Sequence, residues 1–162
     1  MKITFTLITL TFALLLSGCN VVADIYLEYN YSGKSVYYGD FSEIKTVDEI
    51  APWLKAHITY DASNSGVYHN PADTISSGRG CCTDFTIAWL NIAYVNFGIK
   101  AEAVVINYAQ ASKAIVSGGI DYDHSVVRYN GVILEPQSGA GKTYSANTVI
   151  YYVYSFDDIF TK

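Results

Sequence analysis

Two neighbouring cysteines and a downstream histidine are the residues of this sequence best suited to covalent chemistry. Cys82 follows a glycine-punctuated stretch and begins an apolar segment, and His124 lies 42 residues after it. A thiol at a helix start, with an imidazole and a carboxylate nearby, is the minimum set for a thiolate nucleophile. The helix end and the protonated ring both favour the thiolate because they place positive charge near the sulfur. The alternative interpretation is a small buried thiol that only packs.

A predicted hairpin brings a carboxylate close to His124. The dipeptide Asn-Gly at residues 130–131 is a strong signal for a two-residue turn, which pairs Tyr129 with Val132. Continuing that register places Glu135 on the same face as His124, one diagonal step away. A glutamate there can orient the ring and stabilise its protonated form. The alternative is a surface ion pair that contributes little to stability.

The elements that must position these residues follow from local patterns. A capping-box sequence at residues 46–49 predicts a helix that continues to about residue 58, with Pro52 in or near its first turn. Residues 82–97 are apolar on nearly every face, which predicts a buried helix ended by Gly98. Residues 61–80 read as a polar loop and 112–119 as a connecting loop. Alternating patterns predict an N-terminal hairpin (25–31 with 34–38) and later strands at 101–108, 125–129, 132–135 and 148–154. Helices followed by antiparallel strands indicate an α+β fold.

The same motifs, taken together, resemble the transglutaminase-like domains of the papain-like cysteine enzymes. The resemblance rests on Asn-Pro-Ala-Asp-Thr-Ile at residues 70–75 and Gly-Arg-Gly-Cys-Cys-Thr-Asp-Phe at 78–85. It continues with Asp-His-Ser-Val-Val at 123–127 and Leu-Glu-Pro at 134–136, and covers about residues 52–135. It implies a buried helix that bears the nucleophile, packed on an antiparallel sheet that bears the histidine and the acidic residue.

The resemblance also implies a role for each candidate residue. Cys82 takes the place of the nucleophile and Cys81 falls on a variable position. His124 takes the place of the base and Glu135 that of the third triad member, where the family more often has aspartate. The backbone N–H of Cys82, with one side-chain donor, is implied as the oxyanion hole.

The first 19 residues resemble a bacterial lipoprotein signal. A lysine at position 2 precedes an apolar stretch of about 14 residues, which is short for a span that needs about 20. Leu-Ser-Gly then precedes Cys19, so we expect residues 1–18 to be removed and Cys19 to be lipidated, for example with palmitate. Residues 19–162 suit a single domain, with 19–45 as a hairpin or extension. The expected location is the cell envelope, with the domain facing the periplasm or the exterior.

The net charge and the placement of His, Cys and Asp residues argue against a nucleic-acid partner and against a metal site. Fifteen acidic residues against ten Lys and Arg give a net charge of −5, or −6 without the lysine at position 2, which argues against a nucleic-acid partner. Membrane attachment would therefore depend on the lipid. Asp121, Asp123 and His124 lack the second His or Cys cluster that a metal site needs, so we expect no metal and no cofactor.

The leading hypothesis is a membrane-tethered cysteine enzyme that hydrolyses or transfers amide bonds of a peptide or protein substrate. A Cys82–His124–Glu135 triad would act through a thioester. The alternative is a catalytically inactive lipoprotein that keeps the scaffold as a binding module. A cell-wall amidase of a related cysteine family is less favoured, because the Asp-Cys-Ser-Gly sequence of those enzymes is absent.

Overall fold

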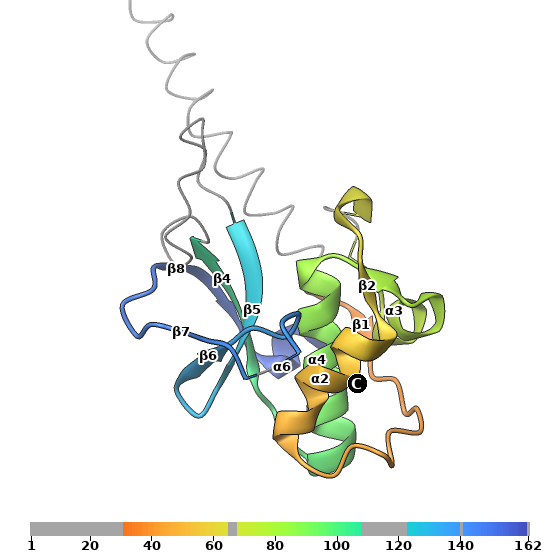
Figure 1. The fold of residues 1–162 in the computed structure, drawn as a ribbon. Coiled ribbons are helices and arrows are strands. Elements are labelled where there is room, and N and C mark those ends of the chain that lie inside the picture. Colours follow the sequence, from red (N-terminus) through yellow and green to blue (C-terminus); the bar gives the residue numbers. More distant parts are fainter. Residues whose placement is uncertain (1–30, 65–67, 108–122, 140, 162) are drawn as a thin grey trace, which may run out of the picture.

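A five-stranded antiparallel sheet lies beside a central buried helix (Figure 1). The computed structural model describes residues 31–64, 68–107, 123–139 and 141–161. The strands follow the order β7-β6-β5-β4-β8, and each pairs in antiparallel fashion with its neighbours. Their bounds are β4 Glu102–Asn107, β5 Asp123–Tyr129, β6 Val132–Leu134, β7 Thr143–Tyr144 and β8 Ile150–Tyr154. The α+β class predicted from the sequence is confirmed, and four of the strands were predicted to within two residues.

The central helix is α4 (Cys82–Phe97), with the bounds that the sequence predicted. Its residues from Thr83 to Ala93 are all buried, because the sheet packs on one side of the helix and α2 (Ile50–His57), α3 (Pro71–Ser77) and the segment after β1 (Lys34–Ser35) pack on its other sides. Gly98 ends it in the left-handed conformation, with φ 67°, which glycine adopts without a steric penalty. The sheet contact is made largely through β5, the strand that carries His124.

The predicted capping box also forms. A 3₁₀ turn, η1 (Val47–Glu49), leads into α2 (Ile50–His57), and Glu49 Oε2 accepts the backbone N–H of Thr46 at 3.2 Å. Pro52 lies in the first turn of α2, where its missing N–H has no intrahelical acceptor to lose. Ile50 and Leu54 are fully buried against α4. Helix α2 thereby fixes one side of α4.

The hairpin between β5 and β6 has the predicted turn and register. Asn130 and Gly131 both have positive φ angles, 50° and 76°, as a type I′ turn requires. Tyr129 pairs with Val132, as predicted. Glu135 follows directly after β6 and so comes to lie near His124.

The polar loop predicted for residues 61–80 is wrong in part. It contains η2 (Ala62–Asn64), α3 (Pro71–Ser77) and β3 (Arg79–Gly80), and β3 pairs with β2 (Thr59–Tyr60) in parallel. Helix α3 begins with proline in its first turn and ends at Gly78 with φ 63°. Its seven residues are mostly small and polar, so no apolar period signals a helix.

The predicted N-terminal hairpin is wrong in the part that the structure describes. Residues 25–30 lie outside the described residues, and the second predicted strand shortens to β1 (Lys34–Ser35). This strand pairs in parallel with β9 (Phe160–Thr161) near the C-terminus. Past β1, the backbone N–H and C=O of Tyr37 bind the side-chain amide of Asn91 on α4, at 2.8 and 2.9 Å. These bonds replace strand pairing in this segment.

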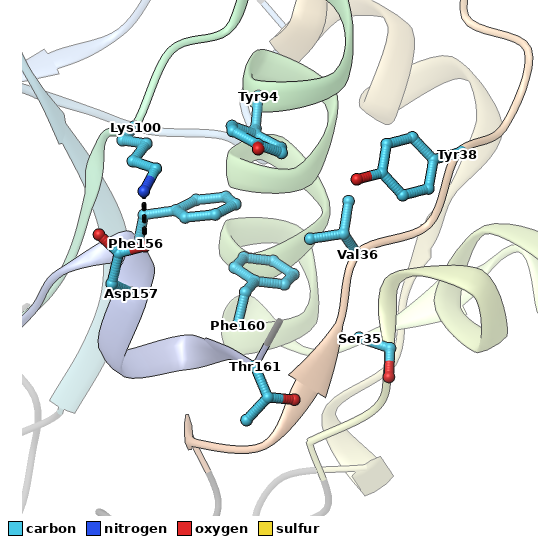
Figure 2. Close-up of a pocket in the computed structure, with 9 residues that line it drawn as sticks. All are labelled: Ser35, Val36, Tyr38, Tyr94, Lys100, Phe156, Asp157, Phe160 and Thr161. Carbon is cyan, nitrogen blue, oxygen red and sulfur yellow. Dashed lines mark hydrogen bonds and ion pairs between the residues drawn. The ribbon is translucent and has the colours of Figure 1, made fainter.

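The C-terminal segment covers the end of α4 that lies away from Cys82. Helix α6 (Phe156–Ile159) and β9 place two stacked phenylalanine rings beside Tyr94. A cavity of about 450 Å³ opens there, and Lys100 Nζ and Asp157 Oδ1 form an ion pair at its edge at 2.6 Å (Figure 2). No helix within the described residues combines the length and apolar character needed to cross a membrane.

Candidate active site

Asp84 holds the loop that leads into Cys82. Its side chain is fully buried, and Oδ2 accepts the backbone N–H of Cys81 at 2.9 Å. Oδ1 accepts the backbone N–H of His69 at 2.8 Å. A Cβ at Gly80 would lie 2.7 Å from the Asp84 Cβ, so only glycine fits this approach. The carboxylate therefore fixes the chain just before the helix.

Cys82 is the first residue of α4, and the Cys81 thiol lies beside it. Both cysteines are free; Cys81 is buried and Cys82 is partly exposed. The Cys81 side chain is hydrogen-bonded to the Cys82 sulfur. Of the two, Cys82 is therefore the residue more open to solvent.

The structure brings the three predicted site residues together. His124 on β5 is 9% exposed and Glu135 is 6% exposed. The ring Nε2 of His124 lies 2.7 Å from Glu135 Oε2. A further hydrogen bond joins the His124 ring to the Cys82 sulfur, and the backbone N–H of Ser125 also donates to that sulfur. Because Glu135 holds Nε2, the nitrogen left for the sulfur is Nδ1.

These contacts shift both ionisable partners toward their charged forms. The Cys81 thiol, which donates to the Cys82 sulfur, makes the largest contribution to lowering the Cys82 pKa; burial opposes it, and His124 and the Ser125 N–H add to it. The Cys82 pKa falls from its ordinary value near 9 to about 4. Burial disfavours charge on His124, but hydrogen bonds to Cys82 and Glu135 outweigh that effect and raise its pKa to about 9. Near neutral pH the pair is therefore a thiolate and an imidazolium.

The Cys81 thiol moves in the other direction. Its hydrogen bond to the Cys82 thiolate favours the protonated form, and burial adds to this effect, so the Cys81 pKa is raised. One proton therefore stays on Cys81 while Cys82 carries the negative charge. Cys81 acts as a donor to the Cys82 sulfur, a contact that sequence reasoning did not assign to it.

Tyr144 on β7 is a second residue that sequence reasoning missed. It is 8% exposed, and its hydroxyl donates to Glu135 Oε2, the oxygen that also contacts His124. The backbone N–H of Gln137 donates to the other oxygen, Oε1, at 3.2 Å. Burial alone would raise the Glu135 pKa, but the bonds from His124 and Tyr144 lower it below its ordinary value. The sequence held no signal for this contact, because the two-residue strand β7 was not predicted.

Tyr144→Phe is expected to lower the free energy of unfolding by roughly 1.5–3 kcal/mol, the range for a hydrogen bond to a charged group. The ring is retained and only the hydroxyl that donates to Glu135 is lost. Urea unfolding at pH 7 measures the difference. The matched control is Tyr38→Phe, at a side chain that is 75% exposed, where a change below about 0.5 kcal/mol is expected. Equal effects of the two substitutions would contradict the role of Tyr144.

The two other histidines make contacts outside the triad. His69 Nδ1 lies 3.3 Å from Asp84, so this ring supports the loop that leads into Cys82. His57 stacks on Trp53, and its Nδ1 lies 2.8 Å from the Trp53 carbonyl oxygen. Within the described part of the chain, no group of three or more His, Cys, Asp or Glu side chains could hold a metal ion. Cys19 and Asp121 lie outside the described residues.

The comparisons with known proteins give one family. The family model described as the transglutaminase-like superfamily matches residues 33–149, a range that includes Cys82, His124 and Glu135. No curated protein and no solved structure matches the chain significantly. Because the family model covers well over half of its length, the chain belongs to the transglutaminase-like superfamily.

Proposed function

We propose that this protein is a cysteine enzyme that cleaves or transfers amide bonds, peptide or isopeptide, through a thioester intermediate. The observation that carries the proposal is the hydrogen-bonded chain from the Cys82 sulfur through the His124 ring to Glu135. Nucleophile, base and orienting carboxylate are within contact of one another, as acyl transfer by a thiolate requires. Membership of the superfamily adds support, because its members are usually cysteine-based enzymes.

In the first half-reaction the Cys82 thiolate attacks the carbonyl carbon of the substrate amide. A C–S bond forms while the carbonyl π electrons move to oxygen, where N–H groups at the N-terminal end of α4 can stabilise the charge. The His124 imidazolium then gives its proton to the amide nitrogen. The C–N bond breaks, the amine leaves, and a thioester on Cys82 remains with a neutral imidazole beside it.

In the second half-reaction the neutral His124 acts as a base. It removes a proton from water or from an acceptor amine as that nucleophile attacks the thioester carbonyl. Collapse of the tetrahedral intermediate breaks the C–S bond and restores the thiolate and the imidazolium. Water gives hydrolysis and an amine gives transfer; we favour hydrolysis for a single small exported domain.

Glu135 and Tyr144 keep the ring ready for both steps. Glu135 holds Nε2, which directs the other ring nitrogen at the sulfur and favours the charged ring before the first half-reaction, when Cys82 is a thiolate. Tyr144 and the Gln137 N–H in turn hold the carboxylate. A buried glutamate fixed by three donors can serve where the family more often has aspartate, because its extra methylene adds no free rotation.

The proposal includes the location. Removal of residues 1–18 and lipidation of Cys19 would tether the domain to a bacterial membrane, facing the periplasm or the exterior, where a peptide or protein substrate is met. The support is the charged, apolar and small-residue pattern of the leader, which ends at a cysteine.

The test uses p-nitrophenyl acetate, an activated ester that reacts with active thiolates regardless of the natural substrate. We expect a rapid release of nitrophenolate and an acetyl group on Cys82, detected by mass spectrometry, followed by slow turnover. Added glycine methyl ester separates the two outcomes, because transfer yields its N-acetyl product and hydrolysis yields acetate.

His124→Ala is the control, since it keeps the thiol and removes the proton donor and base. Its acetylation rate near neutral pH is expected to fall, because the ring no longer helps to keep Cys82 ionised. Hydrolysis of the acetyl thioester is expected to fall at least about 100-fold, the usual contribution of general acid–base catalysis. Wild-type protein that is acetylated no faster than His124→Ala would refute the enzyme and favour a binding module.

A further inference from the structure

Tyr31 joins the two elements that carry the thiol and the imidazole. Its hydroxyl donates to Ser125 Oγ at 2.8 Å and lies 3.3 Å from Thr83 Oγ1. Thr83 follows Cys82 at the start of α4, and Ser125 follows His124 on β5. One hydroxyl therefore bridges the nearest chain neighbours of the nucleophile and the base. The family match begins at residue 33, so membership of the superfamily does not assign this residue.

The ring of Tyr31 is held on several sides. It is 1% exposed and stacks nearly parallel on Tyr154 of β8, with ring centroids 4.4 Å apart and planes 5° apart. Tyr68 packs against it at a tilt, with centroids 5.3 Å apart. A ring fixed in this way cannot swing its hydroxyl out of the bridge without losing both aromatic contacts. The bridge is therefore a rigid one.

Burial also decides which chemistry the hydroxyl can perform. Desolvation raises the pKa of Tyr31, so the phenol stays protonated across the pH range in which the thiolate exists. A neutral phenol donates a hydrogen bond to Ser125 and does not act as a base. At 1% exposure the side chain does not reach a bound substrate.

We propose that Tyr31 is a positioning residue, which sets the separation of Cys82 and His124 by holding the first turn of α4 to β5. This inference rests on the proposed function, because the ion pair that it positions is the reacting pair. The Ser125 backbone N–H also donates to the Cys82 sulfur, so a shift of β5 at this point would disturb two contacts of the thiolate together. Even small displacements of the reacting groups from their productive geometry lower the reaction rate strongly.

The test compares full-length variants by the pH midpoint of iodoacetamide labelling at Cys82. Tyr31→Phe keeps the stacked ring and removes the bridge, and the midpoint is expected to rise by about one pH unit, a tenfold change in the ionisation constant. Tyr94→Phe makes the same chemical change near the other end of α4 and is expected to leave the midpoint unchanged.

Ser125→Ala and Thr83→Val remove the two partners while Tyr31 stays in place. Each is expected to raise the midpoint, and Tyr31→Phe combined with Ser125→Ala should shift it no further than the larger single change. Ser125→Ala and Thr83→Val also test the bridge if Tyr31→Phe fails to fold. A midpoint that stays at the wild-type value in the bridge variants would overturn the proposal. The midpoint needs no turnover, so a wild type that is not acetylated would count against the proposed function alone.

Discussion

Iodoacetamide is expected to alkylate Cys82 at a nearly constant rate between pH 5 and pH 8. The rate follows the thiolate fraction, and a thiol with a pKa of about 4 is fully ionised over this range. An ordinary thiol, with a pKa of about 8.5, would react several hundred-fold to about 1,000-fold faster at pH 8 than at pH 5. The contrast is large because the Cys81 thiol, the His124 ring and the Ser125 N–H all stabilise the same negative charge.

The chain allows this measurement to be assigned to one sulfur. Trypsin cleaves after Arg79 and Lys100, so Cys81 and Cys82 share one peptide, and fragment ions separate them. Cys82→Ala should abolish the rapid labelling, because Cys81 is buried and its pKa is raised. His124→Ala should move the midpoint upward. Wild-type labelling that rises tenfold per pH unit from pH 5 to pH 8 would show an ordinary thiol and remove the basis of the mechanism.

The parts of the site that the sequence predicted are those with local signals. Helix α4 follows a glycine-punctuated stretch at one end and stops at Gly98 at the other, so its bounds could be assigned from neighbouring residues alone. The relation of His124 to Glu135 followed from two turn residues, since the turn fixes the register and the register fixes the face. The hairpin pattern therefore predicted that His124 and Glu135 lie together, as they do.

Several contacts that the sequence did not predict join elements that have no local signal or lie far apart in the chain. Tyr31 reaches Ser125 across 94 positions of the chain, and β1 pairs with the C-terminal strand β9. Two-residue strands such as β7 and β9 have no period to detect, so Tyr144 could not be placed beside Glu135. In each case the partner is set by how the elements pack in three dimensions, and a single sequence does not encode that packing in any local pattern.

The free energy of unfolding is expected to change with pH because Cys82 and His124 form an ion pair in the folded state. Cys82 has a folded-state pKa below its ordinary value near 9, so its contribution is complete above pH 9 and is lost as the pH falls toward 4. His124 has a raised pKa, so its contribution is complete below pH 6.5 and is lost as the pH rises through about 9. Glu135 has a lowered pKa and contributes fully above its ordinary value of 4.5.

Adding the three contributions gives two regimes. Between pH 4.5 and 6.5 only Cys82 changes its contribution, so the free energy of unfolding should rise by about 1.4 kcal/mol per pH unit. Between pH 6.5 and 9 the gain from Cys82 and the loss from His124 cancel. The folded and unfolded states then bind equal numbers of protons at these groups, and the curve should be flat.

Cys82→Ala separates this signature from the titration of the rest of the protein. Without the thiolate the rise below pH 6.5 should disappear, and above pH 6.5 the stability should fall, because Glu135 still holds His124 in its charged form. Urea unfolding between pH 5 and 9, followed by the fluorescence of the buried Trp89, measures both curves. If the two curves ran parallel over this whole range, the folded state would carry no thiolate–imidazolium pair. Between pH 6.5 and 9 the unfolded chain holds Cys82 as a thiol and His124 as a neutral imidazole. If a proton moves from Cys82 to His124 on folding, only the wild type gains the two opposite charges, so the two curves must diverge.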